Sequence, residues 1–282
     1  MATTAGWAWD APSEPCGPSG PAYHPRTMTS APRHEKVDEM MERAEAALRR
    51  SQWFEAERIA LKALELARRE EDFAAMARIV LPLQEARRQR VQAAVTAAKK
   101  KVRILDADIT EEMPLSPGAY LVQPPTVGAD ARRLRLAALR REVPVAVMCR
   151  EPRTQRGQCP VVAIGAITVR ARIDAPKDWD KPDFAWFVRA MEELGDAAME
   201  MLDSGIELDR QIDYVLNLLD TVPDHEKLHQ LLAAKCAEAA KGFVRSSAPA
   251  GDVLDEELAG IDESELESEL GGGRRKREED EE

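Results

Sequence analysis

The stretch SQWFEAERIALKALELA, residues 51–67, decides the fold of the N-terminal part of this chain. Its small and apolar residues recur at three- and four-residue steps, which places them on one face of a helix. They are Ala56, Ile59, Ala60, Ala63, Leu64 and Ala67. The segment before it, about residues 35–50, has the same periodicity in Val37, Met40, Met41, Ala44 and Leu48. The pattern predicts two antiparallel helices joined by a turn at Ser51-Gln52.

Three details of this hairpin carry a family resemblance. The turn is followed by an aromatic pair, Trp53-Phe54, and then by Ala56. Ala63-Leu64 lies one heptad further on, and Ala44 supplies a small residue where the two helices approach closely. With these features, Val37–Ala67 resembles a single tetratricopeptide unit, which implies a helical hairpin used for binding other proteins.

The resemblance has departures and covers one unit only. Arg43 and Ala47 stand where leucine and tyrosine are usual, and Arg68 replaces the closing proline. No second copy follows, and a lone unit cannot bury its own apolar face. We expect the next helix, residues 73–99, to cover that face. Pro82 lies inside this helix and is expected to kink it or to mark a boundary.

After Lys101 the helical period gives way to short β-rich runs. Strands are expected at 102–105, 119–122, 143–149 and 161–173, with a helix at 130–141 that Asp130 caps. The order strand, helix, strand predicts one right-handed crossover and parallel pairing. A polar loop is expected at 151–160. Three further helices are expected at 183–202, 206–219 and 224–243.

The pattern as a whole predicts an α+β, mostly helical protein. Its expected parts are a disordered N-terminus (1–33), a tetratricopeptide-like helical region of hairpin plus third helix (34–99), a small α/β unit with a sheet of three to four strands (100–175), a C-terminal three-helix region (176–245) and a disordered acidic tail (246–282). Met1 and Met28 are both candidate starts. The oligomeric state stays open.

Composition favours the cytoplasm. The four cysteines form no disulfide framework, and the proline-rich N-terminus lacks the basic and apolar regions of a signal peptide. No apolar run is long enough to span a bilayer, so no membrane partner is expected. Cys149 and Cys159 supply only half of a structural zinc site, and we interpret them as packing residues.

Charge is unevenly distributed along the chain, whose net charge is −11. Residues 252–282 hold 14 acidic and 4 basic residues, whereas residues 87–172 hold 17 basic and 7 acidic residues. The candidate ligand-binding or partner-binding residues are Arg132, Arg133, Arg150, Arg153 and Arg156. They are suited to an acidic partner or phosphate groups, unless they pair with the acidic C-terminal helices. Tyr120 is the only aromatic residue there, which disfavours nucleic acid.

Two short motifs raise the alternative of a metal-dependent hydrolase. Asp106–Thr110 (DADIT) follows a strand and resembles the first motif of haloacid dehalogenase-like phosphatases. His225–His229 (HEKLH) matches the zincin spacing of two histidines and a glutamate. The phosphatase partners do not follow at later strand ends, and the zincin match starts in the first turn of its helix and lacks a third ligand.

The leading functional hypothesis is therefore a non-catalytic interaction or scaffold protein whose partner is another protein. No catalytic residue, metal ligand or cofactor is assigned. The alternatives are the metal-dependent hydrolase and a binder of nucleic acid or an acidic ligand through the basic segment 87–172. A further hypothesis is that the acidic tail competes with such a ligand.

Overall fold

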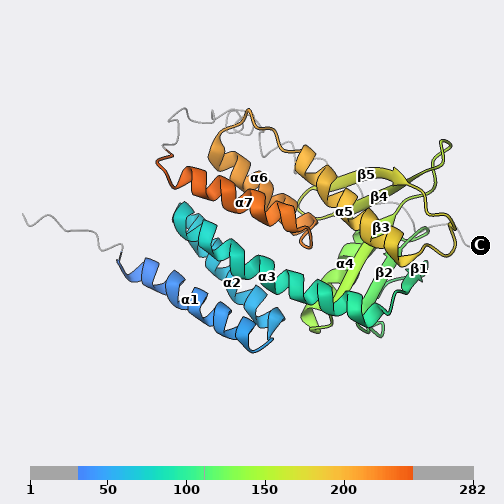
Figure 1. Cartoon of the computed structure of the whole chain (residues 1–282), viewed down its shortest axis with the longest axis horizontal. Helices are drawn as coiled ribbons and strands as arrows, with labels where there is room; N and C mark the ends of the chain where they lie inside the picture. Colours follow the sequence, from blue (N-terminus) through green and yellow to red (C-terminus); the bar gives the residue numbers. More distant parts are fainter. Residues whose placement is uncertain (1–30, 111, 244–282) are drawn as a thin grey trace, which may run out of the picture.

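The computed structural model describes residues 31–110 and 112–243, in which the N-terminal and C-terminal helices lie side by side and the β-sheet lies toward the other end of the molecule (Figure 1). The helices are α1 (Ala31–Arg49), α2 (Trp53–Arg69), α3 (Phe73–Ala98), α4 (Gly128–Arg140), α5 (Phe184–Glu200), α6 (Leu208–Thr221) and α7 (Glu226–Ala239). The strands are β1 (Val102–Leu105), β2 (Gly118–Val122), β3 (Val145–Arg150), β4 (Gln158–Ile164) and β5 (Thr168–Asp174). The α+β class expected from the sequence is confirmed. None of these helices is long and apolar enough to cross a bilayer.

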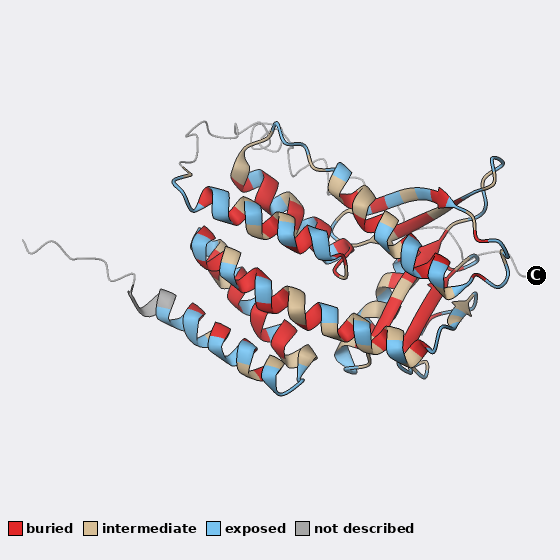
Figure 2. Cartoon of the chain, viewed as in Figure 1, coloured by how far each residue is buried: buried red, intermediate tan, exposed pale blue. Residues whose placement is uncertain are grey.

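The hairpin of α1 and α2 packs against α3, and α3 in turn packs against α7. Figure 2 shows that α1 is buried only along the side that faces its neighbours; these buried residues include Val37, Met41 and Ala44. The open face of the hairpin is thus covered by the next helix, as expected. Pro82 is buried within α3 and marks no boundary, because the helix continues to Ala98.

The sheet has five strands in the order β1-β2-β3-β4-β5, one more than the upper limit expected. β1, β2 and β3 are parallel, which confirms the crossover through α4, and β4 and β5 are antiparallel additions. The run 161–173 is two strands because the chain turns at 165–167, where Gly165 N–H donates to the carbonyl of Ile167. The single glycine was a weak turn signal, so the run resembled one strand.

Helices cover both faces of the sheet. α3 and α5 lie on one face, where the core includes Ala146, Met148 and Phe187, and α4 lies on the other, where it includes Cys149 and Leu134. Neighbouring residues of β3 alternate between these two cores because successive strand side chains point to opposite faces. Because β1, β2 and β3 are parallel and in register, their carboxyl ends lie at the same end of the sheet, the place where α/β proteins bind ligands.

Several element boundaries differ from expectation by a few residues; β4, for example, begins at Gln158, inside the loop expected at 151–160. Residues 31–33 belong to α1 and are not disordered, whereas 1–30 and 244–282, with Met28 and the acidic tail, lie outside the described residues. α4 begins at Gly128, so Asp130 lies in its first turn. From there its carboxylate accepts the N–H of Val127 at 2.9 Å, which satisfies a free helix-start donor.

Gly195 allows α5 and the start of α7 to approach closely. A Cβ built there would lie 2.1 Å from Nδ1 of His225, whose ring is buried.

Replacement of glycine by alanine within a helix normally stabilises a protein by about 1 kcal/mol, but at Gly195 the overpacking costs about 1–3 kcal/mol. We expect Gly195→Ala to lower the unfolding free energy, measured by urea denaturation. Gly205→Ala, in a loop where the nearest atom is the exposed Asp203 carboxylate at 3.1 Å, is the control with a smaller effect. Increased stability of Gly195→Ala would contradict this packing.

Candidate functional site

A depression of about 480 Å³ lies at the carboxyl end of the parallel strands. We call it the arginine pocket; it is lined by Gln123, Pro124, Arg150, Pro152, Arg153, Trp179 and Asp180. Gln123 follows β2 and Arg150 ends β3, so the parallel register brings them together. Trp179 and Asp180 come from the connection between β5 and α5, which crosses the same end of the sheet.

Arg150 is the central side chain of this pocket. Only 1% of the residue is exposed, and its guanidinium carbon lies 4.1 Å from the centroid of the Trp179 ring. Nε donates to Oε1 of Gln123 at 3.1 Å, and Nη2 donates to the same oxygen. Nη1 is buried without a hydrogen-bond partner among the described residues. Burial lowers the pKa of Arg150, although the charge of Asp180 opposes that shift.

The contrast with the other buried arginines shows what Arg150 lacks. Arg87 and Arg90 are also buried, and each forms an ion pair with Glu57. In the described part of the chain no carboxylate forms an ion pair with Arg150; its bonded partner is a neutral amide. A buried charge without a counter-charge is costly. Asp180 lines the same pocket and partly offsets this cost, but it forms no ion pair with Arg150 in the described chain.

Arg153 adds a second positive charge at the pocket. It is exposed, and its guanidinium carbon lies 5.9 Å from the centroid of the same Trp179 ring. Guanidinium groups bind carboxylates and phosphates through paired N–H donors, and the indole face stabilises a nearby cation. Arg150, Arg153 and Trp179 together form an arrangement suited to one small anionic group.

The five candidate arginines do not gather at one place. Arg150 and Arg153 lie together in the pocket, whereas Arg132 and Arg133 lie on α4 and have local partners. Arg132 pairs with Asp220 at 3.0 Å, and Arg133 bonds the Asp130 carboxylate at 2.6 Å. Arg156 lies exposed in the turn before β4 and does not line the pocket.

Arg135 also lies on α4 and has a structural partner. It donates to the carbonyl oxygens of Asp220 and Thr221, the last residues of α6, at 2.7 and 2.8 Å. Burial lowers its pKa to about 10, so it stays charged at neutral pH. Its charge is favourable there because helix C-termini carry partial negative charge.

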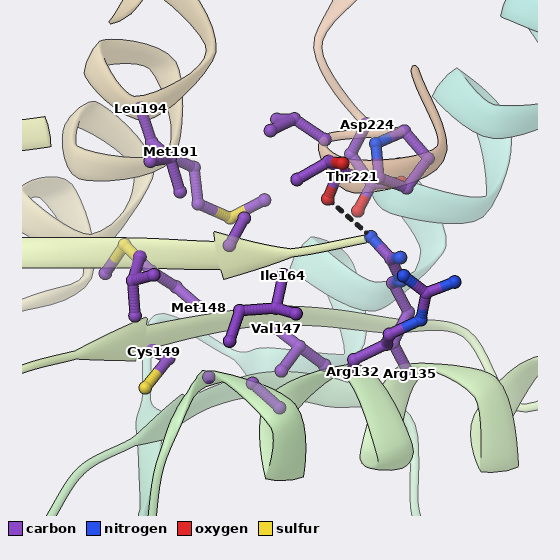
Figure 3. Close-up of a pocket in the computed structure, with 16 residues that line it drawn as sticks. Arg132, Arg135, Val147, Met148, Cys149, Ile164, Met191, Leu194, Thr221 and Asp224 are labelled. Carbon is purple, nitrogen blue, oxygen red and sulfur yellow. Dashed lines mark hydrogen bonds between the residues drawn. The ribbon is translucent and has the colours of Figure 1, made fainter. Parts of the chain in front are cut away.

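Arg132 and Arg135 lie at one side of a second cavity, opposite Met191 and Leu194 of α5 (Figure 3). The cavity measures about 50 Å³. That volume holds only a few water molecules, at roughly 10–15 Å³ for each. It is a packing void under α4, and too small for a substrate.

The two hydrolase motifs lie in different surroundings, and the phosphatase-like motif occupies Asp106–Thr110. Asp106 and Asp108 are exposed after β1, at the carboxyl end of the sheet, but do not line the arginine pocket. The phosphatase hypothesis stays a prediction.

The two histidines of the zincin-like motif point to different elements. The His225 ring lies against Gly195 of α5. In His229, Nδ1 lies 2.9 Å from the His225 carbonyl oxygen, so this nitrogen carries the proton, and Nε2 faces Arg87 Nη1 at 3.3 Å. Burial and the Arg87 charge lower the pKa of His229 to about 3. The two rings thus have different neighbours in this structure, which disfavours zincin geometry, and the zincin hypothesis stays a prediction.

Sequence reasoning missed a buried network that joins α2, α3 and the turn before α7. Glu57 lies 2.9 Å from Arg87 and 3.2 Å from Arg90, and Arg90 donates to Asp224 at 2.7 Å. Desolvation raises the pKa of Glu57, but the Arg87 and Arg90 charges outweigh it and hold this pKa below its usual value. The only sequence signal was charge next to the apolar faces of α2 and α3.

Cys149 and Cys159 lie on opposite faces of the sheet, in different parts of the core. Burial raises their thiol pKa values to about 12 and about 11, so neither is a thiolate at neutral pH. Their interpretation as packing residues is confirmed.

A comparison of the chain with protein-family models, curated proteins and solved structures finds no match. The arginine pocket therefore has to be interpreted from its own residues.

Proposed function

We propose that this is a non-catalytic binding protein that holds an acidic group of a partner protein in the arginine pocket. The observation that carries the proposal is the buried Arg150, whose Nη1 has no partner among the described residues. Arg87 and Arg90, the other arginines buried in the described chain, pair with Glu57, whereas Arg150 forms no such ion pair, which favours a ligand that supplies an anionic group.

The surroundings of Arg150 support an anionic ligand. Gln123 fixes one edge of the guanidinium, Trp179 covers its face, and Arg153 brings a second charge from the loop after β3. Asp180 also lines the pocket, and it disfavours highly charged polyanions. A single carboxylate or phosphate therefore fits best, as on the surface of a partner protein with an acidic segment.

Removal of Arg153 is the sharpest test because this side chain is exposed and its loss leaves the core intact. We expect Arg153→Gln to weaken binding of a synthetic peptide with a single glutamate in a neutral sequence roughly tenfold or more, because a charged hydrogen bond contributes about 1.5–3 kcal/mol. Isothermal titration calorimetry at low salt measures the affinity. Inorganic phosphate, titrated in parallel, separates recognition of the anionic group from recognition of the peptide.

Arg156→Gln is the matched control, because it removes the same charge from the same loop outside the pocket. Its affinity should change by less than about twofold, since an exposed charge contributes little. Equal losses in the two variants would show attraction to the basic loop as a whole. That result, or the absence of any binding, would contradict the proposed site.

A further inference from the structure

A second polar cluster lies between α5 and the start of α7, away from the arginine pocket. Glu192 and Asp196 are one turn apart on α5, so their side chains share one helix face. His225 precedes α7 at its N-cap and packs its ring against α5 at Gly195. One potential ligand atom from each of these three residues lies within 4.8 Å of the other two.

The geometry of His225 points into this cluster. Its side chain is only 2% exposed, and Nε2 has no hydrogen-bond partner in the described part of the chain. Nε2 lies 3.3 Å from Oδ1 of Asp196, and Nδ1 lies 3.6 Å from Oε2 of Glu192. In tetrahedral coordination with metal–ligand bonds of about 2.0–2.1 Å, neighbouring ligand atoms lie roughly 3.3 Å apart.

Lys227 shows that the cluster already attracts a cation. Its Nζ lies 3.0 Å from Glu192 and 2.7 Å from Asp196, so one ammonium group bridges both carboxylates. Hydrogen bonds to Asp196 and Glu192 raise the pKa of Lys227. The lysine is about half exposed, so its flexible side chain can leave without disturbing the core.

We propose that Glu192, Asp196 and His225 form a binding site for a divalent transition-metal ion, which displaces the ammonium group of Lys227. One imidazole nitrogen with two carboxylate oxygens suits zinc, cobalt or manganese, whereas calcium and magnesium prefer oxygen ligands alone. The half-exposed carboxylates leave the remaining coordination positions to water.

This site differs from the zincin-like pattern of the sequence. It uses His225 with carboxylates from another helix, whereas His229 is held by Arg87 and Glu226 bonds Gln84 of α3. The metal would join α5 to α7, two helices that already pack together. Binding of an ion to the folded chain alone would also raise its stability.

The test titrates the full chain with Zn²⁺ by calorimetry and with Co²⁺ by visible absorption, which reports the coordination geometry. We expect one ion per chain. Glu192→Gln and Asp196→Asn should each weaken binding at least tenfold, and Lys227→Met should tighten it at least tenfold. These exposed substitutions avoid the risk that a His225 variant fails to fold.

Glu193→Gln is the matched control, because Glu193 neighbours Glu192 but pairs with Arg189 on the outer side of α5. Its affinity for the metal should equal that of the unchanged chain. Absence of binding in both the unchanged chain and Lys227→Met would overturn the proposal. Equal loss in Glu192→Gln and Glu193→Gln would overturn it too, because general attraction to acidic residues then explains the binding.

Discussion

Replacement of Glu57 by glutamine is expected to lower the free energy of unfolding by about 3–5 kcal/mol, the usual effect of breaking a buried ion pair. Glu57 is 5% exposed and is the shared counter-charge of Arg87 and Arg90. Glutamine keeps the shape and one acceptor oxygen, but it leaves Arg87 without a carboxylate partner and Arg90 with Asp224 alone. Urea denaturation followed by far-UV circular dichroism measures the change.

Glu65→Gln provides the control on the same helix. Glu65 pairs with Arg69 one turn away, and both side chains are more than half exposed. Solvent screens such a pair, so its loss should change the unfolding free energy by less than about 1 kcal/mol. Similar effects in the two variants would show that burial does not strengthen the Glu57 interaction.

A second large effect is the loss of folding stability at acidic pH. His229 has a folded-state pKa of about 3, whereas an unfolded histidine has a pKa of about 6.5. Below pH 6.5 the unfolded chain therefore binds a proton that the folded chain does not. Stability from this group is complete above pH 6.5 and is lost progressively as the pH falls toward 3. The expected loss approaches 1.4 kcal/mol per pH unit, or about 2 kcal/mol between pH 6.5 and 5.

The variant His229→Gln has no titrating group at this position. It tests both the direction of the pH dependence of stability and its assignment to His229. The unfolding free energy is measured at a series of pH values between 5 and 8. Below pH 6.5 its slope against pH should be smaller in this variant than in the unchanged chain, by about 1.4 kcal/mol per pH unit, which corresponds to one proton. Above pH 7 the two slopes should agree. His225 also has a lowered pKa and keeps part of the slope in both proteins. An unchanged slope in His229→Gln would show that His229 is accessible to protons in the folded state.

Local patterns explain why the helices were predicted and the pocket only in part. The periodicity of Ala56, Ile59 and Ala63 depends on neighbours within a few residues, so it predicts α2 directly. Arg150 and Arg153 were noted as charges in a basic segment. Their meeting with Trp179 depends on the path from β5 to α5, and no short-range pattern encodes that path.

Charged residues next to an apolar helix face were the sequence signal for the buried network of Glu57, Arg87 and Arg90. Glu57 borders the face of α2, and Arg87 and Arg90 border that of α3, where solvent exposure was the natural expectation. Their burial depends on the opposite charges that meet between the two helices, and the sequence does not show that these faces will touch. The fifth strand was missed for a related reason, because Gly165 was the only local sign of a turn.

The bond between Arg90 and Asp224 joins positions that are 134 residues apart in the chain. During synthesis, the helices up to α3 leave the ribosome long before Asp224 is made, and until then Arg90 lacks one of its two carboxylates. Closing so large a loop is slow compared with local helix formation. The helices α1 to α3 therefore do not complete their charged contacts by themselves. Arg90 of α3 gains its second carboxylate only when nearly the whole described chain is present.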